Sequence, residues 1–519
     1  MHFSAAKTKL IWSMSNFSFE QNSVESLAEL LLDGKLNALR ATFTPSLVPH
    51  LKELRTALTS RLETYSHIAT PAAHFPYILS LVGRRAIAKI SVAKRDVEIG
   101  EILTIDFSVD SDAIAKPQQN SDSKNIEVIF TSDDMFADLR IGSPLIFSYG
   151  QVDAVIKEIN KQSQGYQVMA EVTCAGTLIS GMDVHSSDIS RTLYPLTEAD
   201  KNALESRCDD LADYILIHGV TSEEQVKDIK KNFVTSTSQA SKRHPTVSIT
   251  STIKDPNALV PPRFILKIDS AINLQLLPML LPHIDGIFLS RSELGLTVPP
   301  NSLPLVQKEV IALCNQSAKI VIVASELMYS MRLNPNPTRA EVSDMVNAVS
   351  DGADALVLAE EVTEGPYRKS LAEVCRDTIA SAEPFLDANW QRVPFSVQND
   401  DDAIAYGALQ VAQNTKAKAI VCLTEGGYTA LRLSSLRAPI EIIAVTYNKN
   451  VSRQLMLCRA VTTITLESQP AFEEILATTK HLLHTYHGFE RGDRIVFVSL
   501  TASSVAAKNS NLFTMQEID

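Results

Sequence analysis

A chain of 519 residues, 45% of them hydrophobic and with a formal net charge of −12, has room for roughly two to four globular domains but lacks the basic surface that nucleic acids need. No apolar run reaches the roughly 18 residues of a membrane helix and no secretory leader is recognisable, so we expect a cytoplasmic protein without membrane contact. Six widely spaced cysteines predict buried free thiols, with a zinc or disulfide framework as the alternative.

Short apolar runs alternate with helix-patterned segments over much of the chain. Each run is bounded by polar, Gly or Pro residues and has the length of a buried parallel strand. Eight such alternations predict an α/β fold, a closed (β/α)8 TIM barrel. The predicted strands are Lys9–Ser13, Ala38–Phe43, Tyr77–Leu81, Tyr214–Gly219, Phe264–Asp269, Asp285–Ser290, Ile320–Ser325 and Ala355–Glu360.

Helix patterns lie between these strands. In one place a Pro-Thr-Arg-Ala-Glu turn leads into a helix, and Thr338, Arg339 and Glu341 put short polar side chains on a loop of the kind where α/β barrels keep their chemistry. The Ser/Thr/Pro-rich connection between Asn232 and Pro262 predicts a surface loop. The predicted helices are Ser23–Asp33, Glu198–Asp213, Ser222–Asn232, Leu303–Ser317 and Arg339–Ser350.

Two stretches break this alternation. Residues 88–188 alternate with a period of two and lack long helices, which predicts an all-β domain inserted into a barrel of residues 1–87 and 189–387. Residues 388–519 predict a separate α/β domain. The strands expected in the insertion are Glu101–Val109, Ile126–Phe130, Leu145–Phe147, Val152–Ile159 and Tyr166–Val172. The C-terminal elements are helices Asp402–Gln413 and Ala471–Tyr486 and strands Ala419–Leu423, Ile440–Val445, Thr462–Leu466 and Arg494–Ser499.

This organisation and several motifs resemble the pyruvate kinase family, from about Lys7 to Leu512. The segments that carry the resemblance are Leu196-Thr197-Glu198-Ala199-Asp200, Asp285 to Arg291 with Leu294-Gly295, Asn336 to Glu361, and Arg437-Ala438-Pro439-Ile440. The resemblance implies the glycolytic transfer of a phosphoryl group from phosphoenolpyruvate to ADP, which yields pyruvate and ATP. It also implies Mg²⁺, K⁺ and a homotetramer.

Three positions match catalytic residues of that family. Lys267 matches a lysine that stabilises the phosphoryl group and the enolate, and Arg40 matches an arginine that contacts phosphate. Ser325 stands for a threonine near the path of proton delivery and keeps its hydroxyl. Beside it, Glu326 replaces a glutamine and adds negative charge facing an anionic substrate. Phosphoryl transfer needs positive charge on the moving group, which makes the first two residues the main candidates.

The family's metal-binding positions stay acidic but exchange their side-chain lengths. Asp269 stands for a glutamate and Glu293 for an aspartate, so the sum of their reach is preserved. Because Mg²⁺ demands near-ideal geometry at about 2.0–2.1 Å, one methylene matters, and we expect a weakened Mg²⁺ site. In the substrate-binding stretch, Ser292 replaces a glycine whose backbone approaches the substrate carboxylate, and its Cβ narrows that pocket.

The end of the third strand departs most from the family. Where the family reads Asp-Thr-Lys-Gly-Pro-Glu-Ile-Arg, this chain reads Ser80-Leu81-Val82-Gly83-Arg84-Arg85-Ala86-Ile87. Ile87 thereby replaces an arginine that faces phosphate. At the potassium site Thr42, Thr44 and Ser80 offer only hydroxyls, and Arg85 adds a fixed positive charge. We therefore expect no bound K⁺.

Two further loops bear on nucleotide and effector binding. The stretch Leu178 to Asp183 has no basic residue where the family carries nucleotide-binding lysines on its closing lid. The loop of Thr424, Glu425, Gly426, Gly427, Tyr428 and Thr429 is similar to the family's effector-phosphate loop. Its small residues and hydroxyls can expose backbone amides as an anion nest, with Thr424, Gly426, Gly427 and Thr429 as candidates. A plain turn is the alternative, because Glu425 opposes an anion.

Two functions stay open at this point. The losses at the third strand end, at Ser292 and in the lid predict a folded, oligomeric family member with weak or no phosphotransfer. Such a chain would be a scaffold, a regulatory partner of an active paralogue, or a metabolite sensor. Lys267, Arg40 and the acidic pair favour instead a divergent, active, potassium-independent pyruvate kinase that binds phosphoenolpyruvate and ADP. A barrel with altered chemistry, such as an enolpyruvate lyase, is a third alternative, because one fold hosts many reactions.

Overall fold

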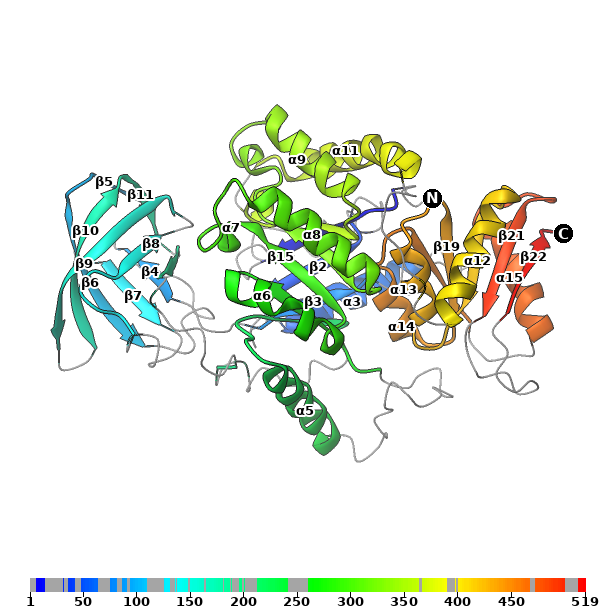
Figure 1. Ribbon diagram of the computed structural model, residues 1–519, viewed down its shortest axis with the longest axis horizontal. Helices are drawn as coiled ribbons and strands as arrows, with labels where there is room; N and C mark the ends of the chain where they lie inside the picture. Colours follow the sequence, from blue (N-terminus) through cyan, green and yellow to red (C-terminus); the bar gives the residue numbers. More distant parts are fainter. Residues whose placement is uncertain are drawn as a thin grey trace.

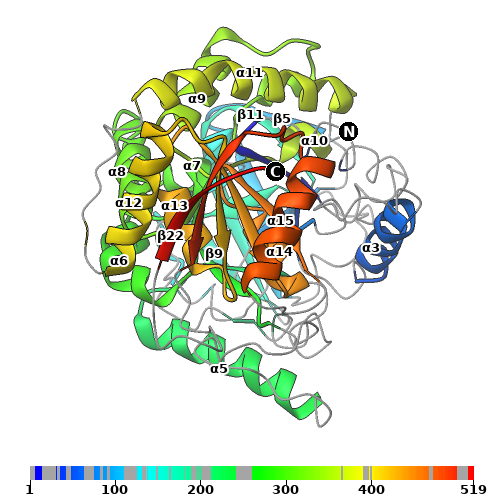
Figure 2. The same cartoon turned by 90° about the vertical axis from the view of Figure 1, so that its right-hand side faces the viewer.

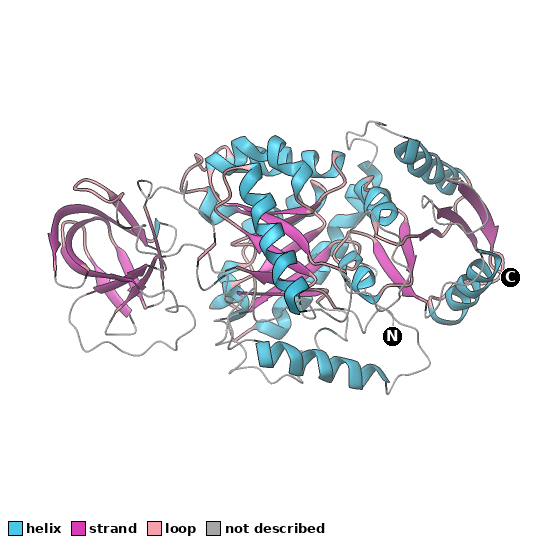
Figure 3. Cartoon of the chain, turned by 90° about the horizontal axis from the view of Figure 1, so that it is seen from below, coloured by secondary structure: helices cyan, strands magenta, loops and turns pink. Residues whose placement is uncertain are grey.

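The computed structural model describes residues 6–14, 31, 36–42, 48–63, 75–81, 86–90, 94–109, 126–130, 136, 138–147, 150–162, 165–180, 182–186, 188, 196–197, 200, 212–240, 260–363, 366–389, 397, 400–466, 472–499 and 512–519. Three units lie in a row: a small β-barrel, a central barrel surrounded by helices, and an α/β unit that holds the C-terminus (Figure 1). The view from below gives the same order (Figure 3). Among these residues, no helix combines the length and hydropathy that crossing a membrane requires.

The central unit is a closed barrel of eight parallel strands, which confirms the predicted fold. Its strands follow the chain order around the ring, and the last strand pairs with the first. Leu10 and Trp12 pack under the surrounding helices, whereas Ile11 between them belongs to the barrel interior, as the period of two requires. The strands are β1 (Lys9–Met14), β2 (Ala38–Thr42), β3 (Tyr77–Ser80), β13 (Tyr214–Ile217), β14 (Arg263–Ile268), β15 (Gly286–Ser290), β16 (Ile320–Ala324) and β17 (Ala355–Leu358).

The helices around the barrel follow the prediction only in part. α9 (Arg339–Ser350) has the predicted limits, and α8 (Leu303–Gln316) ends one residue early. The helix predicted to end at Asn232 was too short, because α5 spans Glu223–Ala240, where no Gly or Pro interrupts the pattern. That helix replaces the first part of the expected surface loop. The predicted helices at 23–33 and 198–213 lie almost entirely outside the described residues. The other elements are α3 (Val48–Glu63), α6 (Ala271–Leu280), η4 (Leu281–His283), α7 (Arg291–Leu294), η5 (Tyr329–Arg332), α10 (Glu360–Thr363) and α11 (Arg368–Asn389).

A capping box explains the sharp start of α9. The Thr338 hydroxyl accepts the N–H of Glu341 at 3.3 Å, and the Glu341 carboxylate accepts the N–H of Thr338 at 2.7 Å. The same carboxylate accepts the backbone N–H of Ser330 in η5 at 2.6 Å. The polar residues that the sequence singles out here therefore join two elements and satisfy backbone donors at a helix start.

The inserted unit is a second closed barrel, which confirms the all-β prediction. Its buried and half-buried residues alternate along the strands, as in β6, and Phe107, Phe130 and Phe136 meet edge to face in its core. The limits 88–188 stay a prediction. The strands are β4 (Ala86–Lys89), β6 (Ile102–Val109), β7 (Ile126–Phe130), β8 (Pro144–Phe147), β9 (Val152–Lys161), β10 (Tyr166–Cys174) and β12 (Asp183–His185), with the separate pair β5 (Lys94–Val97) and β11 (Gly176–Ile179).

The C-terminal unit is an open sheet of five strands in the order β20-β19-β18-β21-β22, and Figure 2 views the molecule from its side. One sheet face packs with α12, α13 and α14, and the other packs with α15. The prediction missed α13, α14 and the antiparallel β22. The elements are α12 (Asp400–Asn414), β18 (Ala419–Leu423), α13 (Tyr428–Ser435), β19 (Glu441–Thr446), α14 (Lys449–Leu455), β20 (Val461–Thr465), α15 (Phe472–Tyr486), β21 (Arg494–Ser499) and β22 (Leu512–Glu517).

The barrel interior and the C-terminal unit share one hydrophobic core. Ile11 and Ile265 of the barrel belong to the same buried cluster as Leu409 of α12 and Leu433 of α13. The C-terminal unit therefore closes the end of the barrel at which the strands begin.

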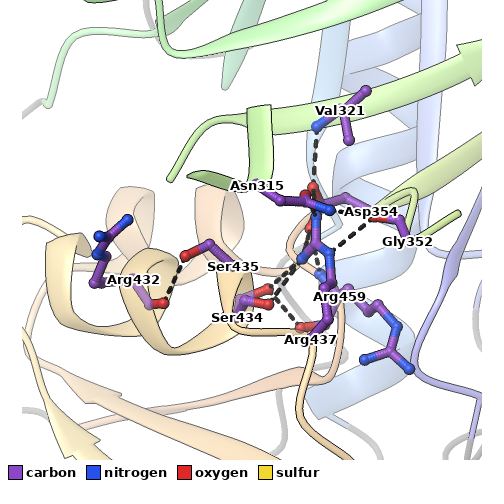
Figure 4. Close-up of polar contacts among 9 residues, drawn as sticks. All are labelled: Asn315, Val321, Gly352, Asp354, Arg432, Ser434, Ser435, Arg437 and Arg459. Atoms are coloured by element: carbon purple, nitrogen blue, oxygen red, sulfur yellow. Dashed lines mark hydrogen bonds and ion pairs between the residues drawn. The ribbon is translucent and has the colours of Figure 1, made fainter. Parts of the chain in front are cut away.

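A buried ion pair reinforces this junction (Figure 4). Arg437, which follows α13, donates to both carboxylate oxygens of Asp354 at 2.9 and 2.6 Å, and the two residues are 1% and 2% exposed. Asp354 also accepts the backbone N–H groups of Val321 in β16 and of Arg459, each at 3.0 Å. The carboxylate is thus fully satisfied, which offsets the cost of burying its charge.

Candidate active site

Polar residues gather where the barrel strands end. Because the eight strands are parallel, their carboxyl ends open on one face of the barrel, which we call the barrel mouth. Ser13, Arg40, Ser80 and Lys267 face the interior there, since the residue before each of them packs under the helices. The inserted barrel follows β3 in the chain and lies on the opposite side of the central barrel from the C-terminal unit (Figure 1).

Lys267 and Glu293 form a buried ion pair at this mouth. β14 presents Lys267 one residue before its end, and α7 presents Glu293 directly after β15. Lys267 Nζ lies 2.5 Å from Glu293 Oε1, and the two residues are 5% and 7% exposed. Little water separates or screens them, so each charge is largely compensated by the other.

Asp269 is fixed by the first turn of α6. Its Oδ1 accepts a hydrogen bond from Nδ2 of Asn273 at 2.8 Å, and this amide also donates to the carbonyl of Lys267 at 3.1 Å. Asn273 Oδ1 in turn accepts the N–H of Ser270, the residue that caps the helix. The sequence therefore uses one capping asparagine to hold the carboxylate and the end of β14 together.

The side chain of Arg40 extends from β2 into the barrel interior. Its Nη1 donates to Ser13 Oγ at 2.8 Å and its Nη2 donates to Ser80 Oγ at 3.2 Å. The guanidinium carbon also lies 5.4 Å from the centroid of the Phe288 ring, a cation–π contact. Two neutral hydroxyls and an aromatic face thus hold this cation in a fixed orientation.

The turn after β16 has a strained backbone. Ser325 and Glu326 have φ values of 80° and 56°, in a region that residues with a Cβ seldom adopt. Arg291 of α7 holds this turn, because it donates to the carbonyls of Ser325 at 2.6 Å and of Ala324 at 3.3 Å. An ion pair with Asp344 at 2.7 Å orients the arginine.

Two acidic residues flank this turn. Glu361 is 2% exposed and accepts the N–H groups of Ala359 at 2.8 Å and Met328 at 3.4 Å. Partial burial raises the pKa of Glu326, Arg291 opposes that rise, and Glu361 adds to it. Burial therefore disfavours the charged form of Glu326 relative to a freely solvated glutamate.

The remaining predicted positions are spread over several elements. Thr42 pairs in register with Ser80 at the ends of β2 and β3, and Ser292 lies half-buried in α7. Ile87 is half-buried in β4 of the inserted barrel, where it pairs in register with Ile129 of β7, and its aliphatic side chain offers no charge to a phosphate. Thr44, Arg85 and Gly181 lie outside the described residues.

The carboxylates do not fit a divalent metal in the arrangement described. Asp269 has one oxygen engaged by an amide, and Glu293 has one engaged by an ammonium group. Within the described part of the chain, no group of three or more His, Cys, Asp or Glu side chains could hold a metal ion. Since Mg²⁺ needs carboxylate oxygens at about 2.0–2.1 Å in near-octahedral order, these contacts would have to change before it could bind.

The C-terminal loop is bonded to itself and to the barrel. The Thr424 hydroxyl accepts the N–H of Gly427 at 2.9 Å, and Arg263 at the start of β14 donates to the carbonyl of Gly426 at 2.7 Å. Gly427 has a φ of 87°, and a Cβ there would lie 2.7 Å from Arg263 Nη2. Thr424 and Thr429 are each 1% exposed. An effector site in this loop stays a prediction.

Sequence reasoning missed several residues of the mouth. Ser13 and Phe288 could have been found from the alternation of strand faces, and Asn273 from its spacing to the capping Ser270. His218, which follows β13 and contacts the carbonyl of Leu81 at 2.8 Å, had no comparable signal.

The central barrel, with its inserted β-barrel and its C-terminal α/β unit, defines an α/β-barrel protein of three units, whose mouth is lined by a lysine, an arginine and buried carboxylates. Residues 7–371 match the sequence profile of the pyruvate kinase barrel domain, and residues 402–513 match that of the pyruvate kinase alpha/beta domain. The chain belongs to the pyruvate kinase family.

Curated relatives agree with this assignment. The chain is 27% identical over 390 residues to a pyruvate kinase of Clostridium perfringens, a match that covers 74% of this chain and 77% of the relative. It is 30% identical over 356 residues to a pyruvate kinase of Bacillus licheniformis, covering 67% and 56%, and 28% identical over 375 residues to one of Staphylococcus saprophyticus, covering 71% and 60%. The match spans less than two thirds of the length of the latter two proteins.

Proposed function

We propose that this member of the pyruvate kinase family has weak or no phosphotransfer activity. The carrying observation is that Lys267 and Arg40, two cations in the described part of the barrel mouth, contact protein groups, Lys267 with Glu293 and Arg40 with two serines. Transfer of a phosphoryl group from phosphoenolpyruvate to ADP needs positive charge directed at the moving group. An entering anion would have to displace these partners first.

The proposal includes a weakened Mg²⁺ site and no bound K⁺. Asp269 and Glu293 are the residues that would hold Mg²⁺, which when bound would supply charge stabilisation for phosphoryl transfer. Each already has a partner within the protein. Thr42 and Ser80 bring hydroxyls and no carboxylate to the place expected for K⁺.

A steady-state assay tests this proposal. Pyruvate formed from phosphoenolpyruvate and ADP is measured by coupling to lactate dehydrogenase, while Mg²⁺, Mn²⁺ and K⁺ are varied separately. We expect a turnover well below about 1 s⁻¹, the low end of ordinary enzyme rates. A rate above that value that is lost in Lys267→Met would contradict the proposal. The loss in the variant rules out a contaminating kinase.

A divergent, potassium-independent pyruvate kinase is the second candidate, and a specific observation favours it. Lys267 and Asp269 lie at the end of β14, Glu293 lies in α7 just after β15, and Arg40 lies within β2. The turn after β16 carries Ser325 in a strained conformation of the kind found at functional sites. In that case phosphoenolpyruvate and ADP would be ligands, and the rate would be the same with and without K⁺.

For a chain without turnover we propose a scaffold or regulatory role in the cytoplasm. Its partner would be its own copy, in a family-like homotetramer, or an active paralogue in a mixed oligomer. Size-exclusion chromatography with light scattering gives the mass of the assembly. A thermal shift with phosphoenolpyruvate separates a metabolite sensor, which is stabilised by its ligand, from a pure scaffold, which is not.

A further inference from the structure

The ion pair at the barrel mouth bears directly on metal binding. Glu293 reaches Lys267 at 2.5 Å from a helix of four residues, and both side chains are more than nine-tenths buried. A buried carboxylate needs a positive partner, because an uncompensated charge in the interior is costly. At Glu293 the lysine supplies that partner, and a metal ion would be the other group able to do so.

We propose that the Lys267 ammonium group is a built-in substitute for a divalent cation at Glu293, so that the ion pair must open before the chain can hold a divalent metal. This inference deepens the proposed function, on which it rests, by naming the contact that closes the site. The ligand it concerns is a small divalent cation such as Mn²⁺ or Mg²⁺.

The length of the Glu293 side chain makes the contact possible. Its carboxylate stands one methylene farther from the backbone than that of an aspartate, a difference of about 1.5 Å. The backbone of α7 is fixed, because Arg291 in the same turn is anchored to the carbonyl of Ser325 and to Asp344. An aspartate at position 293 therefore could not keep a 2.5 Å contact with Lys267 unless the lysine moved.

The partner of the second acidic residue, Asp269, opposes metal binding less than the partner of Glu293 does. Asp269 contacts the neutral amide of Asn273 at 2.8 Å, whereas Glu293 contacts a full positive charge. A neutral amide competes only weakly with an incoming cation for a carboxylate, whereas an ammonium group bound to the carboxylate repels that cation. The Lys267–Glu293 contact therefore limits metal affinity, and Asn273 is of secondary importance.

Mn²⁺ binding to the full-length chain tests the inference without substrate or nucleotide. Free Mn²⁺ is measured by electron paramagnetic resonance as protein is titrated, for the natural chain, Glu293→Asp and Lys267→Met. We expect no saturable site tighter than about 1 mM in the natural chain and at least about a tenfold tighter site in each variant, the scale on which metal-site partners act. Glu309→Asp, the same change at an exposed position of α8, serves as the matched control and should leave Mn²⁺ binding unchanged.

A second readout covers the risk that Lys267→Met, which leaves a buried carboxylate unpaired, fails to fold. Mn²⁺ should then raise the midpoint of thermal unfolding of Glu293→Asp more than that of the natural chain, because a ligand that binds only the folded state stabilises it. Natural protein that binds Mn²⁺ as tightly as Glu293→Asp would overturn the inference. Tight Mn²⁺ binding without turnover would refute this inference alone, whereas turnover without a detectable site in the free protein would refute only the proposed function.

Discussion

Lys9, where the first barrel strand begins, illustrates how one buried charge lowers the stability of the folded state. It is the first residue of β1, is 6% exposed, and donates to the carbonyl of Val461 in the C-terminal unit at 3.0 Å. Burial, together with the nearby Arg376, lowers the pKa of Lys9 from 10.5 to about 8. Since the folded state binds this proton less tightly than the unfolded chain, the charged lysine opposes folding at neutral pH.

Replacing Lys9 by methionine should therefore stabilise the protein at neutral pH. Because the folded pKa lies below the unfolded one, the free energy of unfolding of the natural chain should rise as the pH increases from about 8 towards 10.5. Lys9→Met should lack that rise and should gain up to about 3 kcal/mol at neutral pH, less the lost hydrogen bond. Urea unfolding at a series of pH values measures both effects. Lys52→Met, an exposed change on α3, is the control, and an equal pH slope in both variants would contradict the argument.

Single residues of the site were predictable where chemistry follows strand periodicity. Lys267 and Arg40 lie at interior positions of β14 and β2, so strand periodicity places both side chains on the inner side of the barrel. The partner of Lys267 was not predictable, because its ion pair depends on how α7 packs after β15. Side-chain length alone suggested that the Glu293 carboxylate could still reach a metal. In the structure this carboxylate contacts the Lys267 ammonium group instead.

Among the elements, the start of α9 shows how local sequence fixes a boundary. Thr338 and Glu341 satisfy each other's backbone N–H groups, and Glu341 also accepts the N–H of Ser330. Partial burial alone would raise the pKa of Glu341, but hydrogen bonds from the hydroxyls and backbone N–H groups of Ser330 and Thr338 lower it overall. The charged carboxylate is thus the form that holds η5 and α9 together.

Removal of this cap should have a graded effect. Thr338→Ala should lower the free energy of unfolding by about 1 kcal/mol, the usual value of an N-cap, while Thr338→Ser should be near neutral. Glu341→Ala should cost more, because it also releases Ser330. Denaturant unfolding of the three variants gives the order. A loss for Thr338→Ser as large as that for Thr338→Ala would show that the hydroxyl is not what matters.

The helices that the sequence did not predict are short, and the helix predicted too short continues into a segment that was expected to be a loop. α13 and α14 have eight and seven residues, too few for a helical period to stand out, and each forms by packing on the sheet. α5 continues through Thr235, Ser236 and Thr237. These residue types are weak helix formers, but the segment has no Gly or Pro to end the helix. The long, strongly patterned β/α alternation, by contrast, predicted the fold correctly.

At the scale of the whole molecule, the Arg437–Asp354 pair ties the barrel to the C-terminal unit. Arg437→Met leaves a carboxylate buried without its partner, so we expect a loss of about 3–5 kcal/mol. Arg494→Met removes an ion pair whose side chains are 48% and 59% exposed, and it should change stability by no more than about 1 kcal/mol. Urea unfolding followed by circular dichroism compares the two, and equal effects would refute a structural role for the buried pair.

The interior of the barrel continues without a break into the C-terminal sheet, and this continuity constrains how the gene can change. A truncated copy that ended before residue 400 would not fold as a smaller barrel, because Ile11, Ile265 and their neighbours would be exposed to water. Selection against misfolding alone would therefore preserve the central barrel together with the C-terminal unit in a lineage that no longer needed turnover. Full length is thus a poor guide to whether this chain still works as a catalyst.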